Sequence, residues 1–356
     1  MLDGLRGVAA VIVVLFHITE FHYTDPQSRQ FNHGYLAVDF FFLLSGFVIG
    51  YAYDDRWNGM TPWTFLKRRL IRLHPMVIVG SLLGAALFYF SASKLFPIVG
   101  GTPVPRLLIM TLLGALLIPV PPSADVRGWG EIFPVNAPSW SLFFEYIANI
   151  LYALGLRRLG IKPLGILTAV FAAALIHLSV NMADGMLIGG WTMSGDQFRI
   201  GMTRLLFPFF GGLFLFRLGR LIRIKHAFPV AAVLLVAVLL APRIGDASTN
   251  WMNGFYESLV IILVFPLIVM IGAGGSAGSR TGGKVCDFLG EISYPLYLVH
   301  YPIFYVYFGW AHDKGLTLSA SWPYALLAIV ISIATAYGAL RLLDAPIRKR
   351  LTRFAR

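Results

Sequence analysis

The amino-acid sequence predicts an all-α, polytopic membrane protein of about ten spans, with a re-entrant or interfacial segment near residues 93–137. Hydrophobic residues make up 57% of the 356 residues and charged residues only 13%. This composition is typical of proteins that cross a bilayer several times. Apolar runs of about 20 residues recur along the chain, and the basic residues gather in short segments between them.

Eleven apolar runs are expected to be helical. They cover residues 5–22, 35–53, 75–92, 106–119, 138–156, 163–181, 203–218, 228–241, 254–273, 294–311 and 323–343. The run 106–119 is short and is bracketed by prolines, so we expect it to be re-entrant or interfacial. With the other ten runs as spans, every basic segment falls on one side, which predicts that both termini are cytoplasmic.

Composition also limits the classes of function. The net charge of +12 comes from basic residues between apolar runs, where they set topology and meet anionic lipid, so we expect no nucleic-acid partner. The single cysteine excludes an intramolecular disulfide, and the histidines lack metal-ligand spacing, so no metal is expected. We expect one integral-membrane domain over 1–356 with no appended soluble domain, and a flexible loop at 272–283.

The first span carries Arg6 near its start and His17 eleven residues later. Eleven helical steps bring both side chains to one face, about 16.5 Å apart along the axis. Arg6 is either an anchor at the cytoplasmic rim or part of an anion site. His17 is either a hydrogen-bonded core histidine or a general base.

Two carboxylates fall within later spans. Asp39 lies in the outer third of the second span, so it can pair with His17 or form a structural salt bridge to another span. Glu145 lies on one helical face with Ser141, inside an outer interface marked by Trp140. Arg204 opens its span from outside, either as an interfacial anchor or as the partner of Glu145.

Further polar residues lie at the cytoplasmic level. Arg68 and Arg72 share a helical face, either as a topological anchor or as a guanidinium fork for phosphates. Ser293, Tyr297 and His300 form a polar, aromatic entrance to the ninth span. By contrast, His22 and His33 are interpreted as solvated loop residues.

Several of these stretches together resemble the membrane-bound acyltransferase family 3, bacterial O-acyltransferases that act on surface glycans. The matching stretches are LDGLRGVAAVIVVLFH, VDFFFLLSGFVIG, RRLIRLHP and SWSLFFEY, with weaker support from SYPLYLVHYPIF and DAPIRKR. The closing stretch has Asp344 where the family more often has Glu. The matches run from residue 2 to about 350, nearly the whole chain.

The resemblance implies an O-acyltransferase of the bacterial inner membrane that moves an acyl group, most simply acetyl, from cytoplasmic acyl-CoA to an extracytoplasmic glycan such as lipopolysaccharide, exopolysaccharide or peptidoglycan. His17 would be the base, oriented by Asp39 or Glu145. The donor would be bound by Arg6, Arg68, Arg72, Ser293, Tyr297 and His300, and the acceptor by Trp140, Ser141 and Arg204. Two alternatives stay open: a proton-coupled transporter of a small anionic or sugar substrate, and a non-enzymatic partner of a glycan assembly complex.

Overall fold

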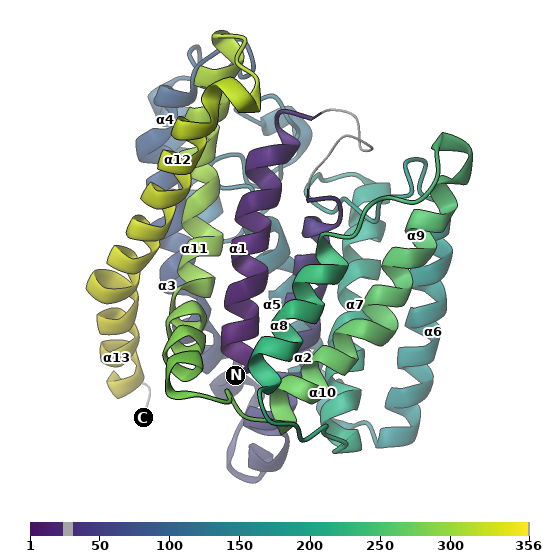
Figure 1. Ribbon diagram of the computed structural model, residues 1–356. Coiled ribbons are helices and arrows are strands. Elements are labelled where there is room, and N and C mark those ends of the chain that lie inside the picture. The colour runs from purple at the N-terminus through teal and green to yellow at the C-terminus, as the bar shows by residue number, and fades with distance from the viewer. Residues whose placement is uncertain (24–30, 355–356) are drawn as a thin grey trace. The chain divides into compact units, whose positions relative to one another are not determined.

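The computed structural model describes residues 1–23 and 31–354, and helices make up most of this part of the chain (Figure 1). The α-helices are α1 (Leu2–Glu20), α2 (Ala37–Tyr53), α3 (Pro62–Leu87), α4 (Val104–Ala115), α5 (Ser139–Leu154), α6 (Ile161–Val180), α7 (Gly195–Leu218), α8 (Ala227–Leu239), α9 (Asn250–Leu259), α10 (Phe265–Gly274), α11 (Arg280–Asp313), α12 (Leu318–Ala339) and α13 (Ala345–Phe354). Short π-helical turns join α9 to α10 and α12 to α13. Extended structure in this part of the chain is limited to one isolated antiparallel bridge, between Glu131 and Thr192.

The predicted all-α class is confirmed, and each apolar run coincides with a helix. Among the described residues, 7 helices are long and apolar enough to cross a membrane, whereas α4 and α8 are shorter. The count of ten spans therefore stays a prediction. The predicted loop at 272–283 is wrong at both ends, because α10 continues to Gly274 and α11 already begins at Arg280. The predicted outer loop at 23–34 falls partly on residues outside the described ranges.

The chain folds into two compact units. The first comprises residues 1–65, 144–189 and 199–293, and the second comprises 66–143, 190–198 and 294–356. Four of the five boundaries between them fall inside α3, α5, α7 and α11, and the fifth, at residues 189–190, lies between α6 and α7.

In the first unit, α1 packs against α2, α8 and α10, while α6 packs along α9 (Figure 1). A reciprocal glycine contact joins α2 to α7. A Cβ on Gly46 would lie 2.0 Å from the carbonyl oxygen of Phe209, and one on Gly212 would lie 2.0 Å from that of Leu43. Only glycine allows the two backbones to approach this closely, which is a common way for membrane helices to pack.

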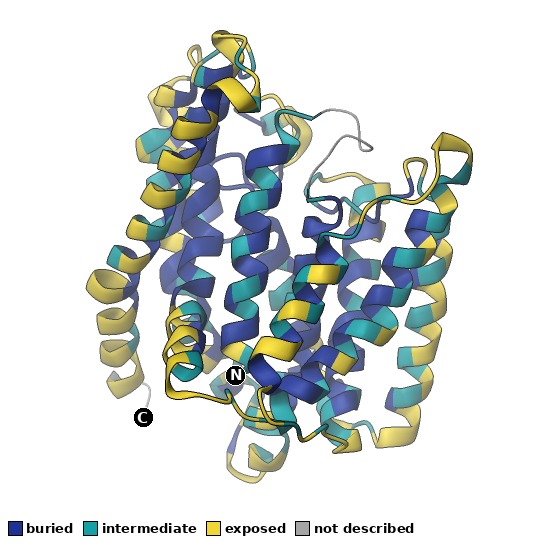
Figure 2. Ribbon diagram, in the orientation of Figure 1, coloured by how far each residue is buried: buried dark blue, intermediate teal, exposed yellow. Residues whose placement is uncertain are grey.

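In the second unit, side-chain hydrogen bonds tie α11 to its neighbours. The Tyr294 hydroxyl donates to the carbonyl of Leu73 in α3 at 2.6 Å, and the Asn136 amide donates to the carbonyl of Leu298 at 3.0 Å. Helix α12 is exposed over much of its length, as Figure 2 shows, and exposed side chains such as Leu326, Val330 and Ile331 are apolar, as expected for a lipid-facing surface.

The segment between α4 and α5 is an ordered loop held by buried charges. The Asp125 carboxylate accepts hydrogen bonds from the backbone amides of Arg127, Gly128 and Gly130 at 2.7–2.9 Å. The guanidinium of Arg127 is 1% exposed and lies over the ring of Tyr305, 3.4 Å from its centroid. The predicted excursion at 93–137 is therefore a folded part of the second unit.

Glu131 lies in the same loop and is 4% exposed. The hydroxyl of Tyr305 donates to its carboxylate at 2.6 Å. Burial raises the pKa of Glu131 to about 8, although Arg127 and the Tyr305 hydrogen bond both favour its ionised form. This carboxyl therefore titrates near neutral pH.

Candidate active site

His17 lies in the last turn of α1 and contacts Glu20 one turn later. The two side chains meet at 2.6 Å, Nδ1 to Oε1, and each retains 22% exposure. The negative end of the helix dipole disfavours the charge of Glu20 at this position, and the imidazole offsets that cost. When Nδ1 carries the proton and donates it to Glu20, the basic lone pair is on Nε2. This arrangement suits proton transfer.

At the other end of α1, Arg6 meets a residue predicted to bind the same donor. Its Nε donates to Oγ of Ser293 at 3.0 Å, and its NH2 group lies 2.8 Å from Asp3. Ser293 belongs to the first half of α11 and is 1% exposed. The side chain of Arg6 retains 28% exposure, so solvent and solutes can reach it.

Asp39 is held by Arg204. The two guanidinium contacts measure 2.6 and 3.2 Å, with the side chains 0% and 1% exposed. Arg204 also donates to the carbonyls of Tyr35 and Gly189. Arg204 is therefore a buried partner of Asp39 rather than an interfacial anchor, and its predicted pairing with Glu145 stays a prediction. Of the two alternatives for Asp39, the structure contains the salt bridge to another helix, because both carboxylate oxygens of Asp39 face Arg204.

Next to this pair lies a buried carboxylate that the sequence reading missed. Glu257 of α9 is 0% exposed and contacts Nδ1 of His33 at 2.9 Å, the hydroxyl of Tyr35, and the backbone amide of Leu187 at 2.6 Å. His33 is therefore not a solvated loop residue. The signal was present in the sequence, because Glu257 falls in the predicted span 254–273.

Glu145 accepts a hydrogen bond from Ser45 of α2 at 2.9 Å. Glu145 was predicted from the sequence as a carboxylate within a span. The contact with Ser45 satisfies one carboxylate oxygen in the first unit and links α5 to α2.

In the second unit, two predicted ligand-binding residues meet. Oγ of Ser141 and the hydroxyl of Tyr297 are 2.8 Å apart. His300, one turn beyond Tyr297, is 0% exposed, and its Nδ1 lies 3.0 Å from the carbonyl of Leu296. Trp140 is 7% exposed and its ring lies 6.4 Å from that of Trp191, centroid to centroid.

The basic cluster of α3 presents its side chains differently. Arg68 is exposed and Arg72 is half-buried, whereas Arg69 is 4% exposed. The spacing of four between Arg68 and Arg72 places them on one helical face, as expected. Arg69 is a buried cation that the sequence reading did not single out, because three adjacent basic residues gave no sign of which one turns inward.

Comparison with known proteins assigns the chain to a family. The profile of an acyltransferase domain, that of acyltransferase family 3, matches residues 1–341. The chain belongs to this family. It is an acyltransferase with several helices able to span a membrane.

Individual relatives agree with this assignment. The chain is 27% identical over 322 residues to acyltransferase MdmB of Streptomyces mycarofaciens, covering 85% of this chain and 78% of that protein. It is 24% identical over 374 residues to O-acetyltransferase OatA of Staphylococcus aureus, covering 98% of this chain but 57% of OatA. A stretch of 189 residues is 36% identical to protein 2 of the picA locus of Rhizobium radiobacter, covering 49% of this chain and 92% of that protein. No solved structure matches the chain.

Proposed function

We propose that this acyltransferase transfers an acyl group, most simply acetyl, from acyl-CoA on the cytoplasmic side to a hydroxyl of a glycan on the outer side of the bacterial inner membrane. The observation that carries the proposal is the arrangement of α1. One helix presents a partly exposed arginine near its start and a partly exposed histidine–carboxylate pair at its end. The relative named as an O-acetyltransferase supports an oxygen acceptor.

His17 acts as the general base in this proposal. Its Nε2 removes the proton from the acceptor hydroxyl as that oxygen attacks the thioester carbonyl carbon. The carbon–sulfur bond breaks, the new carbon–oxygen ester bond forms, and the proton passes to the departing thiolate to give free CoA. The 2.6 Å contact supports Glu20, rather than Asp39, as the carboxylate that orients the ring and stabilises the imidazolium.

The donor phosphates need cations, and each unit offers its own candidates: Arg6 in the first unit, and Arg68 with Arg72 in the second. Guanidinium groups bind phosphate oxygens in pairs, and all three side chains retain exposure. Arg6 keeps its Nε on Ser293, which fixes the direction of the guanidinium.

The remaining predicted ligands stay part of the proposal. Tyr297 and His300 are assigned to the donor, and Trp140 and Ser141 to the acceptor. Glu145 is retained as a second carboxylate to test. We no longer assign Arg204 to the acceptor, because its buried guanidinium is engaged by Asp39 and two carbonyls.

The test measures both halves of the reaction. Wild type and His17→Gln are expressed at matched membrane levels, and cell-envelope glycans are analysed by mass spectrometry for O-acyl esters. The purified protein is assayed with acetyl-CoA and extracted glycan for release of free CoA thiol. Wild type should add esters and release thiol, and His17→Gln should do neither above about 1% of wild type.

Arg68→Gln and Arg72→Gln should raise the KM for acetyl-CoA, whereas Arg158→Gln, an exposed arginine outside the predicted site, should not. Esters at the wild-type level in His17→Gln would refute the assignment of the base. A protein that never releases CoA thiol, yet moves protons with a solute across vesicles, would instead be the proton-coupled transporter.

A further inference from the structure

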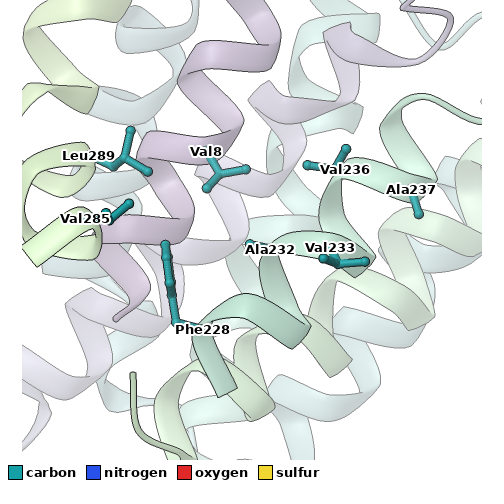
Figure 3. A pocket seen from close by; sticks show the side chains of 8 residues that line it. All are labelled: Val8, Phe228, Ala232, Val233, Val236, Ala237, Val285 and Leu289. Atoms are coloured by element: carbon teal, nitrogen blue, oxygen red, sulfur yellow. The ribbon is translucent and has the colours of Figure 1, made fainter. Parts of the chain in front are cut away.

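An apolar groove lies on the first unit, lined by helices α1, α8 and α11 (Figure 3). Its volume is about 480 Å³, within the range of small-molecule sites. The lining residues are all apolar: Val8, Phe228, Ala232, Val233, Val236, Ala237, Val285 and Leu289. Val233 is 69% exposed, so the groove is open along one side.

At one end of the groove, the first turns of α1, α8 and α11 lie together. A Cβ on Gly4 would lie 2.4 Å from Sγ of Cys286 and 2.9 Å from the ring of Phe228, so the first turns of α1 and α8 meet α11 there. The backbone amide of Ala227 donates to the carbonyl of Ser276 at 2.9 Å, which holds the turn before α11 against the start of α8.

Four basic residues lie in the segments that form this end of the groove. Arg223 and Lys225 precede α8, and Arg280 and Lys284 lie in the first two turns of α11. All four are exposed, and none takes part in an ion pair within residues 1–23 and 31–354. Asp287, one turn further along α11, offsets one of these charges. The groove therefore has an apolar body and a cationic end.

We propose that the groove binds one acyl chain of an anionic phospholipid whose phosphate is held by Lys284, Arg280 and Lys225. From Phe228 to Ala237 the groove runs for about 13.5 Å along α8. That length is close to half of the roughly 30 Å hydrocarbon core, the depth of a single leaflet. A lipid chain that starts at the cationic end fits this depth, and exposed Lys and Arg side chains favour an anionic headgroup.

The experiment uses the full-length protein in detergent, with dioleoylphosphatidylglycerol or dioleoylphosphatidylcholine added and bound lipid measured by native mass spectrometry. Wild type should bind the anionic lipid more tightly than the zwitterionic one. The double variant Arg280→Gln with Lys284→Gln should lose about 30-fold in affinity for phosphatidylglycerol and much less for phosphatidylcholine, because the choline cation already offsets the charge of its phosphate. Arg158→Gln, an exposed arginine away from the groove, is the matched control.

A second variant tests the acyl-chain part. Ala232→Trp fills the groove without a change of charge and should weaken the binding of both lipids. Val170→Trp on the exposed face of α6 should not. Equal affinity of wild type for the two lipids, or unchanged binding in Ala232→Trp, would overturn the proposal. So would a dimer that Ala232→Trp converts to monomer, because a second copy would then cover the groove. If Ala232→Trp does not fold, the charge variants still decide.

Discussion

Glu20→Gln tests whether the carboxylate at the end of α1 serves the reaction through His17. Gln keeps an acceptor oxygen of similar size but removes the negative charge. A hydrogen bond to a charged group contributes roughly 1.5–3 kcal/mol and a neutral one roughly 1 kcal/mol, so the change should cost about 0.5–2 kcal/mol in the transition state, where the imidazolium forms. That corresponds to about a 2- to 30-fold fall in kcat/KM. Solvent screening at 22% exposure favours the lower end.

The assay is release of CoA thiol by the purified enzyme with acetyl-CoA and glycan, and the decisive comparison is a double-mutant cycle. His17→Gln alone should lower kcat by about 10²–10⁴-fold. Glu20→Gln should add almost nothing in the His17→Gln background, because a residue that acts through His17 has no effect once His17 is gone. The matched control is Asp55→Asn, an exposed carboxylate in the same unit.

Two results would refute this reasoning. If the losses from the two single variants multiply in the double variant, Glu20 acts independently of the imidazole. If Glu20→Gln raises the KM for acetyl-CoA and leaves kcat unchanged, the carboxylate belongs to donor binding rather than to proton transfer.

Three further predictions concern stability. Gly46→Ala should destabilise the protein by about 1–3 kcal/mol in thermal unfolding, because its Cβ meets a backbone carbonyl of α7, whereas a Cβ on Gly338 has open space and Gly338→Ala should be tolerated. Glu131 has a pKa of about 8 in the folded protein and about 4.5 in the unfolded chain, so the folded state binds its proton more tightly. Its contribution to the free energy of unfolding is full below pH 4.5 and is lost as the pH rises through 8. The free energy of unfolding should therefore fall by about 1.4 kcal/mol from pH 7 to 9, and Glu131→Gln should abolish that fall. Asp39→Asn should lower the free energy of unfolding by about 3–5 kcal/mol, because it leaves Arg204 buried and charged without its carboxylate. The double variant Asp39→Leu with Arg204→Met should recover much of this stability. A double variant less stable than Asp39→Asn would contradict the prediction.

Most of the fold could be predicted from hydropathy, because lipid-facing helices need long apolar stretches. The residues at which the helices begin and end could not be predicted in this way. The predicted span 75–92 belongs to α3, which begins at Pro62, and the span 294–311 belongs to α11, which begins at Arg280. Hydropathy reports which residues tolerate lipid, whereas a helix continues for as long as its backbone hydrogen bonds do, including through basic segments. Pro75 also lies inside α3, although proline has no backbone N–H to donate, and membrane helices tolerate such a gap.

The site was harder to predict, because the depth of a residue in the membrane does not determine which side chain it contacts. Asp39 and His17 were both expected in the outer halves of their spans, which allowed a pair. The structure gives each a different partner: Arg204 is 165 positions from Asp39 in sequence, and Glu20 is three from His17. The second contact could have been read from helical spacing alone. The first depends on the tertiary packing of α2 against α7, which composition does not encode.

Exposure separates the polar groups of the first unit by role. Asp39, Arg204, His33 and Glu257 are 0–1% exposed, and each has a hydrogen-bonded partner inside the protein. A substrate can reach charges of this kind only by breaking costly buried bonds, so we propose that they hold the helices together. Arg6, His17 and Glu20 retain 22–28% exposure and lie at the two ends of one helix. A thioester and a hydroxyl can reach these groups, and for that reason the chemistry is assigned to α1 rather than to the more deeply buried charges.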